Sequence, residues 1–275
     1  MSTSGSGTLN PLSPIVNQGN LYVTGMQLTY LTNSTFSVGV GQCRDSTDTV
    51  DLIMGAKLYQ ASGAGNTNNS TTSSVAVTVT RTATGAGGLD TGTLAASTLY
   101  YVYAIGDSRS FNATSVVFSL SATTPNLPAG YDCFRRVGCV STNGSSQIRK
   151  FVQTGSGTNR KTWYDAGVAP GSAATAGSTT FVTIGTLTTL VPAIACEAIL
   201  TVSLTPNTAG NTLRVQPFGG TNGYAQISSN VTTKAQFAQL SCPMGLNAGV
   251  PEIDYATSEA SDVVAFLVAG YADQL

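Results

Sequence analysis

Apolar and small polar residues alternate along most of this chain with a period of two, the spacing of a β-strand with one face on a core. After Leu21 such runs recur at short intervals and end at polar or glycine-rich turns such as Thr32–Ser34 and Ser62–Asn66. The runs that predict strands cover residues 21–23, 26–31, 36–40, 75–79, 99–105, 115–120, 135–140, 147–152, 181–184, 198–204, 213–215, 224–227, 234–240 and 262–271. No segment sustains the i, i+3, i+4 stripe and the caps of a helix. The pattern therefore predicts an all-β fold of antiparallel, sandwich-like sheets.

Breaks in this pattern divide the chain into parts. The first residues have no period and include Pro11 and Pro14, which predicts an extended arm that becomes ordered only when it binds something. Thr124–Pro128 interrupts the strands because its prolines cannot donate to a sheet, and Asn143–Gly144 is a dipeptide favoured in tight hairpins. The predicted parts are an attachment arm at 1–20, an N-terminal β domain at 21–125, a basic hairpin or connector at 126–166 and a C-terminal β-sandwich domain at 167–275.

The composition argues against most catalytic chemistry. The 275 residues include no histidine, and only 9% are charged, against about a quarter in ordinary globular proteins. Ser–His–Asp and Cys–His catalysis are thereby excluded. The sequence assigns no catalytic, cofactor-binding or metal-binding residue, and we expect no cofactor.

The five cysteines are spread widely and form no C-x-x-C pair, so they do not predict a zinc site. We expect buried free thiols that behave as small apolar residues. A disulfide between Cys133 and Cys139 is the alternative, which a reducing cytosol disfavours. No apolar run approaches the ~20 residues of a membrane span, and the N-terminus lacks the features of a secretory signal.

Charge is placed unevenly. No residue from Met1 to Cys43 is charged, and every charged residue after Lys234 is acidic. Half of the twelve basic residues lie in one central stretch: Arg135, Arg136, Arg149, Lys150, Arg160 and Lys161. Six basic residues over this length are too few for a nucleic-acid footprint, and the net charge is −1. We expect this stretch to contact another protein subunit or to lie in solvent.

Two groups of acidic residues are candidates for a site. Arg44, with Asp45, Asp48 and Asp51 nearby, predicts a bracing ion pair at a strand end, with a binding site as the alternative. Glycoside hydrolysis needs two carboxylates at a set separation. The candidates for such a pair are Glu197, Glu252, Asp254, Glu259 and Asp262. Glu252 and Asp254 have strand spacing, which points both side chains to one face.

Several short islands, taken together in this order, resemble a family of little-characterised tail-fibre-like virion proteins of tailed bacteriophages and prophages. The resemblance covers roughly residues 21–151, and none of its islands carries a catalytic residue. The islands are Gly41–Thr47, Gly87–Gly92, Tyr100–Tyr103, Leu127–Tyr131 and Arg135–Gly138.

The resemblance implies a non-enzymatic structural protein of the virion, assembled in the host cytoplasm as a homotrimer. Its expected partners are its own copies, other phage virion proteins at the tail or portal vertex, and a glycan or protein of the host surface. We expect neither nucleic-acid binding nor membrane insertion. The alternatives are a capsid decoration or cement protein and a polysaccharide-depolymerising spike.

Overall fold

A computed structural model of the protein describes residues 22–55, 76–221 and 225–275, apart from the side chains of residues 110–113. This part of the chain consists of strands, bridges and turns and contains no helix. Every strand pairing is antiparallel except the short one between β7 and β9. The all-β, antiparallel, sandwich-like fold predicted from the sequence is confirmed. The predicted arm at 1–20 lies outside the described residues.

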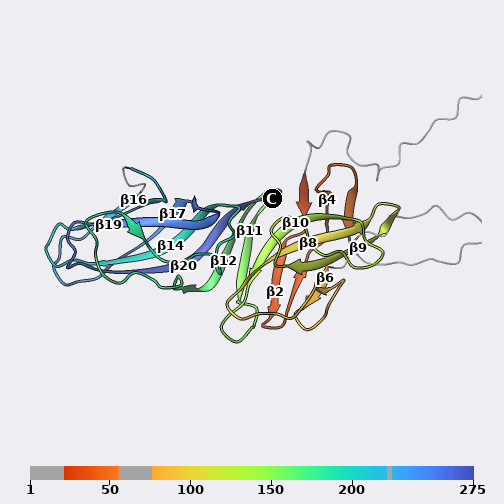
Figure 1. Cartoon of the computed structure of the whole chain (residues 1–275), viewed down its shortest axis with the longest axis horizontal. Helices are drawn as coiled ribbons and strands as arrows, with labels where there is room; N and C mark the ends of the chain where they lie inside the picture. The colour runs from red at the N-terminus through yellow and green to blue at the C-terminus, as the bar shows by residue number, and fades with distance from the viewer. Residues whose placement is uncertain (1–21, 56–75, 222–224) are drawn as a thin grey trace, which may run out of the picture.

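One long sheet runs through the whole molecule, in the strand order β17-β14-β20-β12-β11-β2-β3-β6. These strands are β17 (Gln236–Pro243), β14 (Ala195–Thr205), β20 (Val263–Gln274), β12 (Asn159–Val168), β11 (Phe151–Ser156), β2 (Leu28–Thr32), β3 (Thr35–Val38) and β6 (Val77–Thr80). Figure 1 shows two lobes along the long axis of the molecule, with β11 and β12 between them. We call residues 22–150 the first lobe, residues 171–275 the second lobe, and β11 with β12 the waist.

Two smaller sheets complete the first lobe. They are formed by β1 (Val23–Gly25), β4 (Gly41–Arg44) and β5 (Asp51–Met54), and by β10 (Cys133–Ser141), β8 (Leu99–Asp107), β9 (Ser110–Ser119) and β7 (Gly88–Leu89). All of β8 up to Gly106 is buried, so this strand has core on both faces rather than the one solvent face that alternation predicts. Its Tyr100 ring meets Phe118 edge to face, with ring centroids 5.5 Å apart.

The second lobe is a sandwich of two sheets. A sheet of β13 (Val182–Thr183), β19 (Val250–Thr257), β15 (Thr212–Pro217) and β16 (Ala225–Ser228), with β18 (Gly245–Asn247) paired to β19, packs on β14 and β20 of the long sheet. Tyr255 of β19 and Phe266 of β20 meet across the interior, with ring centroids 4.9 Å apart. Leu213, Val215 and Val264 are also buried in this core. The C-terminus returns to the region between the lobes (Figure 1).

The tight hairpin predicted at Asn143–Gly144 is confirmed over the residues next to the turn, but the longer strands predicted on either side of it pair elsewhere. Next to the turn, the Asn143 N–H donates to the Gln147 carbonyl and the Arg149 N–H to the Ser141 carbonyl, both at 2.8 Å, around the antiparallel bridge of Thr142 with Ile148. β10 pairs with β8 instead, and β11 begins only at Phe151 and forms a hairpin with β12. The apolar, aromatic strand β8 is the better partner for β10, because it buries both strands in the core of the first lobe.

The long sheet crosses the predicted domain boundaries. β9 and β10 lie before and after residue 125, yet both pair with β8. The waist strands, from the predicted connector at 126–166, pair with β2 on one side and with β20 on the other. The division of the chain into separately folding domains therefore stays a prediction, which thermal unfolding of the protein can test.

Candidate functional site

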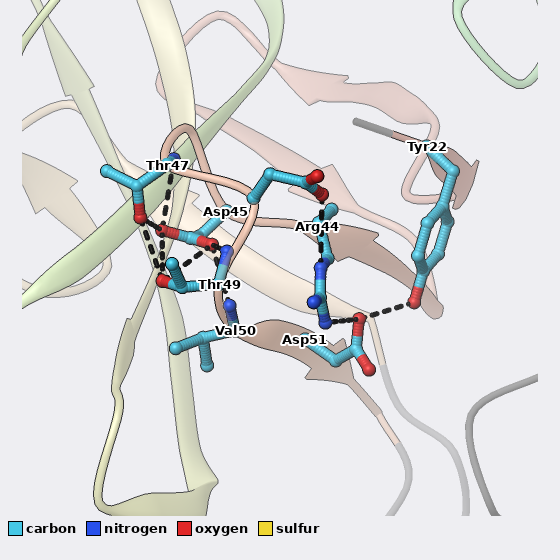
Figure 2. Close-up of polar contacts among 8 residues, drawn as sticks. Tyr22, Arg44, Asp45, Thr47, Thr49, Val50 and Asp51 are labelled. Atoms are coloured by element: carbon cyan, nitrogen blue, oxygen red, sulfur yellow. Dashed lines mark hydrogen bonds and ion pairs between the residues drawn. The ribbon is translucent and has the colours of Figure 1, made fainter. Parts of the chain in front are cut away.

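Asp45 is the centre of a hydrogen-bonded turn between β4 and β5 (Figure 2). Its carboxylate accepts hydrogen bonds from the backbone N–H groups of Thr47, Thr49 and Val50, at 3.1, 2.7 and 2.7 Å, and from the hydroxyl of Thr47. Burial alone would raise the pKa of Asp45, but these hydrogen bonds outweigh burial and lower it. The carboxylate is thus occupied with holding the turn.

Arg44 lies beside this turn and pairs with two aspartates. Its guanidinium is 3.2 Å from Asp48 and 3.1 Å from Asp51, and the Tyr22 hydroxyl donates to the same oxygen of Asp51 at 2.8 Å. Figure 2 shows this group next to the Asp45 turn. The arrangement is the bracing ion pair at a strand end that the sequence predicts.

Two of the six central basic residues are buried, Arg135 and Arg160, and the side chain of Arg136 is 13% exposed. Arg160, on β12, is only 2% exposed. Its guanidinium donates to five oxygens, all within 3.3 Å: the carbonyls of Gly25, Met26, Val137 and Gly157, and Oε1 of Gln153. Burial lowers the pKa of Arg160 to about 10, so the group remains charged at neutral pH. Arg160 fastens the waist to the backbone of the first lobe.

Arg136 makes a second connection, from the first lobe to the second. Its guanidinium donates to Asp273 of β20 at 2.6 Å and to the carbonyl of Gln274 at 2.9 Å. Burial alone would lower the pKa of Arg136, but the Asp273 carboxylate outweighs burial and raises it. Tyr271 adds a hydrogen bond from its hydroxyl to the Cys139 carbonyl at 3.2 Å.

These side chains matter because the backbone connection through the sheet is narrow. β11 pairs with β2 through a single residue pair, Val152 with Thr29. The Leu28 N–H donates to Gln153 Oε1 at 2.9 Å beside it. Arg160 and Arg136 therefore reinforce the link between the two lobes, together with the hydrogen bond from the Ser141 hydroxyl to the Thr189 carbonyl at 2.6 Å.

The remaining central basic residues form no concentrated positive surface. Lys150 pairs with Asp165 at 2.9 Å, and both side chains are more than half exposed. Arg149 donates to the Thr142 carbonyl at 3.1 Å, and Lys161 is exposed. The basic stretch is thus mainly a set of internal contacts rather than one binding face.

The five candidate carboxylates lie in three places. Glu197 pairs across strands with Ala272, near the waist, whereas Asp262 adjoins Val263 at the opposite end of β20. Nine residues of strand separate these positions, or about 30 Å. Glu197 and Asp262 therefore cannot act on one bond.

Asp262 and Glu259 lie at the free end of the second lobe, which we call the tip (residues 205–212 and 257–263). Asp262 is 1% exposed and accepts hydrogen bonds from the Asn207 N–H at 2.9 Å and from the Asn211 amide at 2.8 Å. Glu259 accepts from the Thr208 hydroxyl at 3.2 Å. The sequence indicates a turn at Pro206–Asn207 but not its contact with Asp262. The network fixes a tip rich in amides and hydroxyls.

Glu252 and Asp254 are a second pair of candidate carboxylates that the fold keeps close, after Glu259 and Asp262 at the tip. They lie two residues apart on β19, as their strand spacing predicts. Burial raises the pKa of Asp254, a hydrogen bond from the Gly219 N–H opposes this, and the charge of Glu252 adds to it. Gln216 of β15 lies directly across from Asp254. A carboxyl with a raised pKa beside a second carboxylate is the starting point for acid catalysis.

All five cysteines lie in the described residues, and none is in a disulfide. Four are buried as expected, and the expectation is wrong for Cys196, which is exposed beside a bulge in β14. Burial raises the pKa of Cys43 and of Cys133 to about 12, so neither is a nucleophile at neutral pH. Among residues 22–55, 76–221 and 225–275, no group of three or more cysteine or acidic side chains is placed to hold a metal ion. Nor does this part contain a helix that could cross a membrane.

The islands that carry the resemblance meet one another in the first lobe. The Ser46 N–H donates to the Phe134 carbonyl at 2.8 Å, which joins the Asp45 turn to the segment before Arg135. The Asn126 N–H donates to Asp90 at 2.8 Å, next to the Leu127–Tyr131 island. Their role in this structure is to pack turns against strands.

The sequence matches no protein-family model and no curated protein. Among solved structures, the chain is similar to a carbohydrate binding module (CBM6cm-2) from Cellvibrio mixtus lichenase 5A, solved in complex with cellotriose. The two are 13% identical, the match covers 46% of this chain and 87% of the module, and the TM-score is 0.19. A TM-score this low does not establish a common fold.

Proposed function

We propose that the protein is a non-enzymatic structural subunit of a phage particle, of the tail-fibre type. Its N-terminal arm, residues 1–20, attaches it to other virion proteins, and its second lobe points outward and contacts a glycan or protein of the host surface. Three copies associate in the particle. The family resemblance of residues 21–151 supplies the virion context for this proposal.

The observation that carries the proposal is the sheet that runs through both lobes. Hydrogen bonds of Arg160 and Arg136 reinforce it at the waist. A sheet shared by both lobes holds the two ends of the molecule in a fixed relative position, which a fibre subunit requires.

The two ends of the molecule differ in a way that fits this polarity. β1 begins at Val23 in the first lobe, so the predicted arm joins the chain there. The tip, with Asn207, Thr208 and Glu259, lies at the opposite end. An arm without charge or periodicity cannot offset the ordering entropy of roughly 1–2 kcal/mol per residue by itself. It needs the backbone of a neighbouring virion protein to bind.

Deletion of residues 1–20 tests the attachment. We expect the shortened protein to remain folded, because β1 and the lobes do not include these residues, and to be absent from assembled particles. The control is a full-length chain with all arm residues retained and an affinity tag in the tip turn at 207–210. Incorporation of the shortened protein at normal copy number would refute the attachment by this arm.

Electron microscopy of particles labelled at the tip separates the fibre from a decoration protein. A fibre gives label at a few positions on the tail, whereas a decoration or cement protein gives label over the capsid shell. The tip turn at 207–210 is the better place for the label, because the C-terminus lies between the lobes (Figure 1).

A polysaccharide-depolymerising spike is the second candidate, and the pair Glu252 and Asp254 is the observation that favours it. Release of reducing sugar from host polysaccharide, abolished in Asp254→Asn and Glu252→Gln, would establish this activity. We expect no release from the unchanged protein.

A further inference from the structure

An arginine occupies the middle of the outward face of the second lobe's smaller sheet, formed by β13, β19, β15 and β16. Alternate side chains of a strand point to opposite faces, and Leu213 and Val215 of β15 are buried in the core. Arg214 lies between them and therefore points outward. Its neighbours across the sheet are Ala256 of β19 on one side and Gln226 of β16 on the other. Since β15 has a strand on both sides, Arg214 is not at the sheet edge.

The Phe181 ring contacts the Arg214 side chain and orients it. The guanidinium carbon of Arg214 lies 5.3 Å from the centre of this ring, a distance typical of a cation–π contact. Phe181 comes just before β13, where Val182 pairs with Tyr255, so Phe181 lies next to Ala256 in the register. Ala256 is 0% exposed although it points away from the core, which indicates that the two larger side chains lie over it. The guanidinium is thereby oriented before any ligand binds.

Arg214 differs from most arginines of the described chain in what its N–H groups bind. The others with a recorded hydrogen bond donate to a carboxylate or a backbone carbonyl. They are Arg44, Arg81, Arg109, Arg136, Arg149 and Arg160. Arg214 is partly exposed, and among residues 22–55, 76–221 and 225–275 no hydrogen bond or ion pair to its guanidinium accompanies the Phe181 contact. Its five N–H donors, which form a rigid planar fork, are therefore available to a bound molecule.

Hydroxyl side chains form the next row of this face, toward the tip. Thr212 pairs with Ser228 of β16, and on its other side it exchanges hydrogen bonds with Ser258, whose hydroxyl accepts from the Thr212 N–H at 2.9 Å. The row is two residues, or about 7 Å, from Arg214 along the strands. Ser228, Ser258 and Gln226 are exposed. Hydroxyl and amide groups both donate and accept hydrogen bonds, as the hydroxyls of a sugar do.

The acidic side chains near this face leave the charge of Arg214 uncompensated. Asp254 lies on the same face, on the side away from the hydroxyl row, but it is 8% exposed and accepts a hydrogen bond from the Gly219 N–H. Glu259 accepts a hydrogen bond from the Thr208 hydroxyl at the tip. Neither forms an ion pair with Arg214. The exposed charge at the centre of the face is thus positive.

We propose that this face binds an acidic sugar of a host-surface polysaccharide, with Arg214 bound to the carboxylate of the sugar. The proposal rests on the host-surface contact in the proposed function, and it names the class of glycan and the place where it binds. The side chains concerned, which we call the Arg214 patch, are Phe181, Thr212, Arg214, Gln226, Ser228 and Ser258. Phe181 orients the guanidinium, and the hydroxyl and amide groups bind the sugar hydroxyls.

The charge of the lobe favours a carboxylate over a phosphate monoester. A guanidinium fork fits both groups. Residues 171–275 include six acidic side chains but only two basic ones, Arg214 and Lys234. A group with a single negative charge is repelled less by this lobe than one with a charge of about −1.5 to −2. An acidic peptide is disfavoured because peptides bind along strand edges or in apolar grooves, and the patch lies on a polar sheet face.

Calorimetric titration of the full-length protein tests the proposal. The probes are three polysaccharides that carry carboxylates, namely polygalacturonate, alginate and polysialic acid, with neutral dextran for comparison. We expect binding of at least one acidic polysaccharide and none of dextran. Arg214→Met, whose side chain still covers Ala256, should raise the dissociation constant at least about tenfold, a change of ~1.4 kcal/mol.

Lys234→Met is the matched control. It removes the same charge from the same lobe at an exposed position outside the patch, so it should change the dissociation constant less than about twofold in 0.15 M salt. Arg214→Lys keeps the charge but not the planar fork, and it should bind more weakly than the unchanged protein. Phe181→Leu should raise the dissociation constant about two- to fivefold, because the ring no longer orients the guanidinium. Circular dichroism confirms that each variant is folded.

Four outcomes would overturn the proposal. They are no binding of any acidic polysaccharide, unchanged binding in folded Arg214→Met, equal binding of polygalacturonate and its methyl ester, and tighter binding of polyglutamate or a glycerol phosphate polymer through Arg214. None of these results bears on the place of the protein in the particle. That place is tested separately, by the deletion of residues 1–20 and by the label at the tip.

Discussion

At the scale of single residues, one carboxylate organises the turn between β4 and β5. Asp45 satisfies three backbone N–H groups that would otherwise lack a partner. Asp45→Ala should lower the free energy of unfolding by about 1–3 kcal/mol, because the turn loses its hydrogen bonds to a charged acceptor. Urea unfolding of the two proteins measures the difference, and Asp165→Ala, which removes an ion pair with Lys150 in which both side chains are more than half exposed, is the control. Equal stability of Asp45→Ala and the unchanged protein would contradict this role.

The contribution of Asp45 should also depend on pH. Its pKa in the folded protein lies below the ordinary value of 3.8, so folding favours the ionised form. The stabilisation is therefore complete above the unfolded pKa and is lost as the pH falls through the folded one. The difference in stability between the unchanged protein and Asp45→Asn should narrow from about pH 6 to about pH 2. A constant difference would assign the effect to shape rather than charge.

Arg160 is the residue whose loss should matter most to the waist. Arg160→Met keeps roughly the length of the side chain but leaves the buried carbonyls of Met26 and Val137 without their donor. We expect a loss of about 3 kcal/mol or more in the free energy of unfolding. Lys161→Met, at the exposed neighbouring position, is the control and should change stability by less than about 0.5 kcal/mol. Comparable losses in the two variants would contradict the anchoring role.

At the scale of elements, the sequence predicts strands well where alternation is clean and misses them where charge interrupts it. β14 and β20 are predicted nearly whole, because their inward residues are apolar throughout. β12 is missed because Arg160 occupies an inward position, where the pattern requires an apolar residue. β19 is missed because Asp254 is buried and Pro251 precedes it.

Contacts in the candidate sites can be predicted from the sequence when the partners are close along the chain, and cannot when they are far apart. The ion pairs of Arg44 are predicted because both acidic partners lie within seven residues. The contacts of Arg136 with Asp273 and of Arg160 with Met26 span 137 and 134 positions, and no local pattern indicates them. The sequence predicts the central basic stretch to be a surface, whereas in the structure Arg135 and Arg160 are buried and Lys150 and Lys161 are exposed.

The pairing of β12 with β20 depends on a glycine. A Cβ at Gly270 would lie 2.1 Å from the Thr162 carbonyl oxygen, which is backbone and cannot turn away. Gly270→Ala should therefore destabilise the protein by at least about 1–3 kcal/mol. Gly144→Ala is the matched control, since nothing lies within 4 Å of its Cβ position. A tolerated Gly270→Ala would mean that the two strands separate at little cost.

At the scale of the whole molecule, the shared sheet should make the two lobes unfold together. Scanning calorimetry should give one transition with calorimetric and van't Hoff enthalpies in agreement. Two resolved transitions would instead support the separately folding domains expected from the sequence at 21–125 and 167–275. If the unchanged protein already unfolds in two transitions, Arg160→Met should not reduce the coupling between the unfolding of the two lobes any further.

Because β20 lies between β14 and β12 in the long sheet, the sheet cannot be completed until β20 has been synthesised. β12 ends at Val168 and β14 at Thr205, yet the strand that joins them begins only at Val263. At about 5–20 residues per second, the ribosome needs roughly 5–20 s to travel from β12 to β20. During this interval β12 and β14 present unpaired edges, to which a strand from a neighbouring nascent chain can add. Crowding of ribosomes on one message thus favours exchange of β20 between chains made side by side.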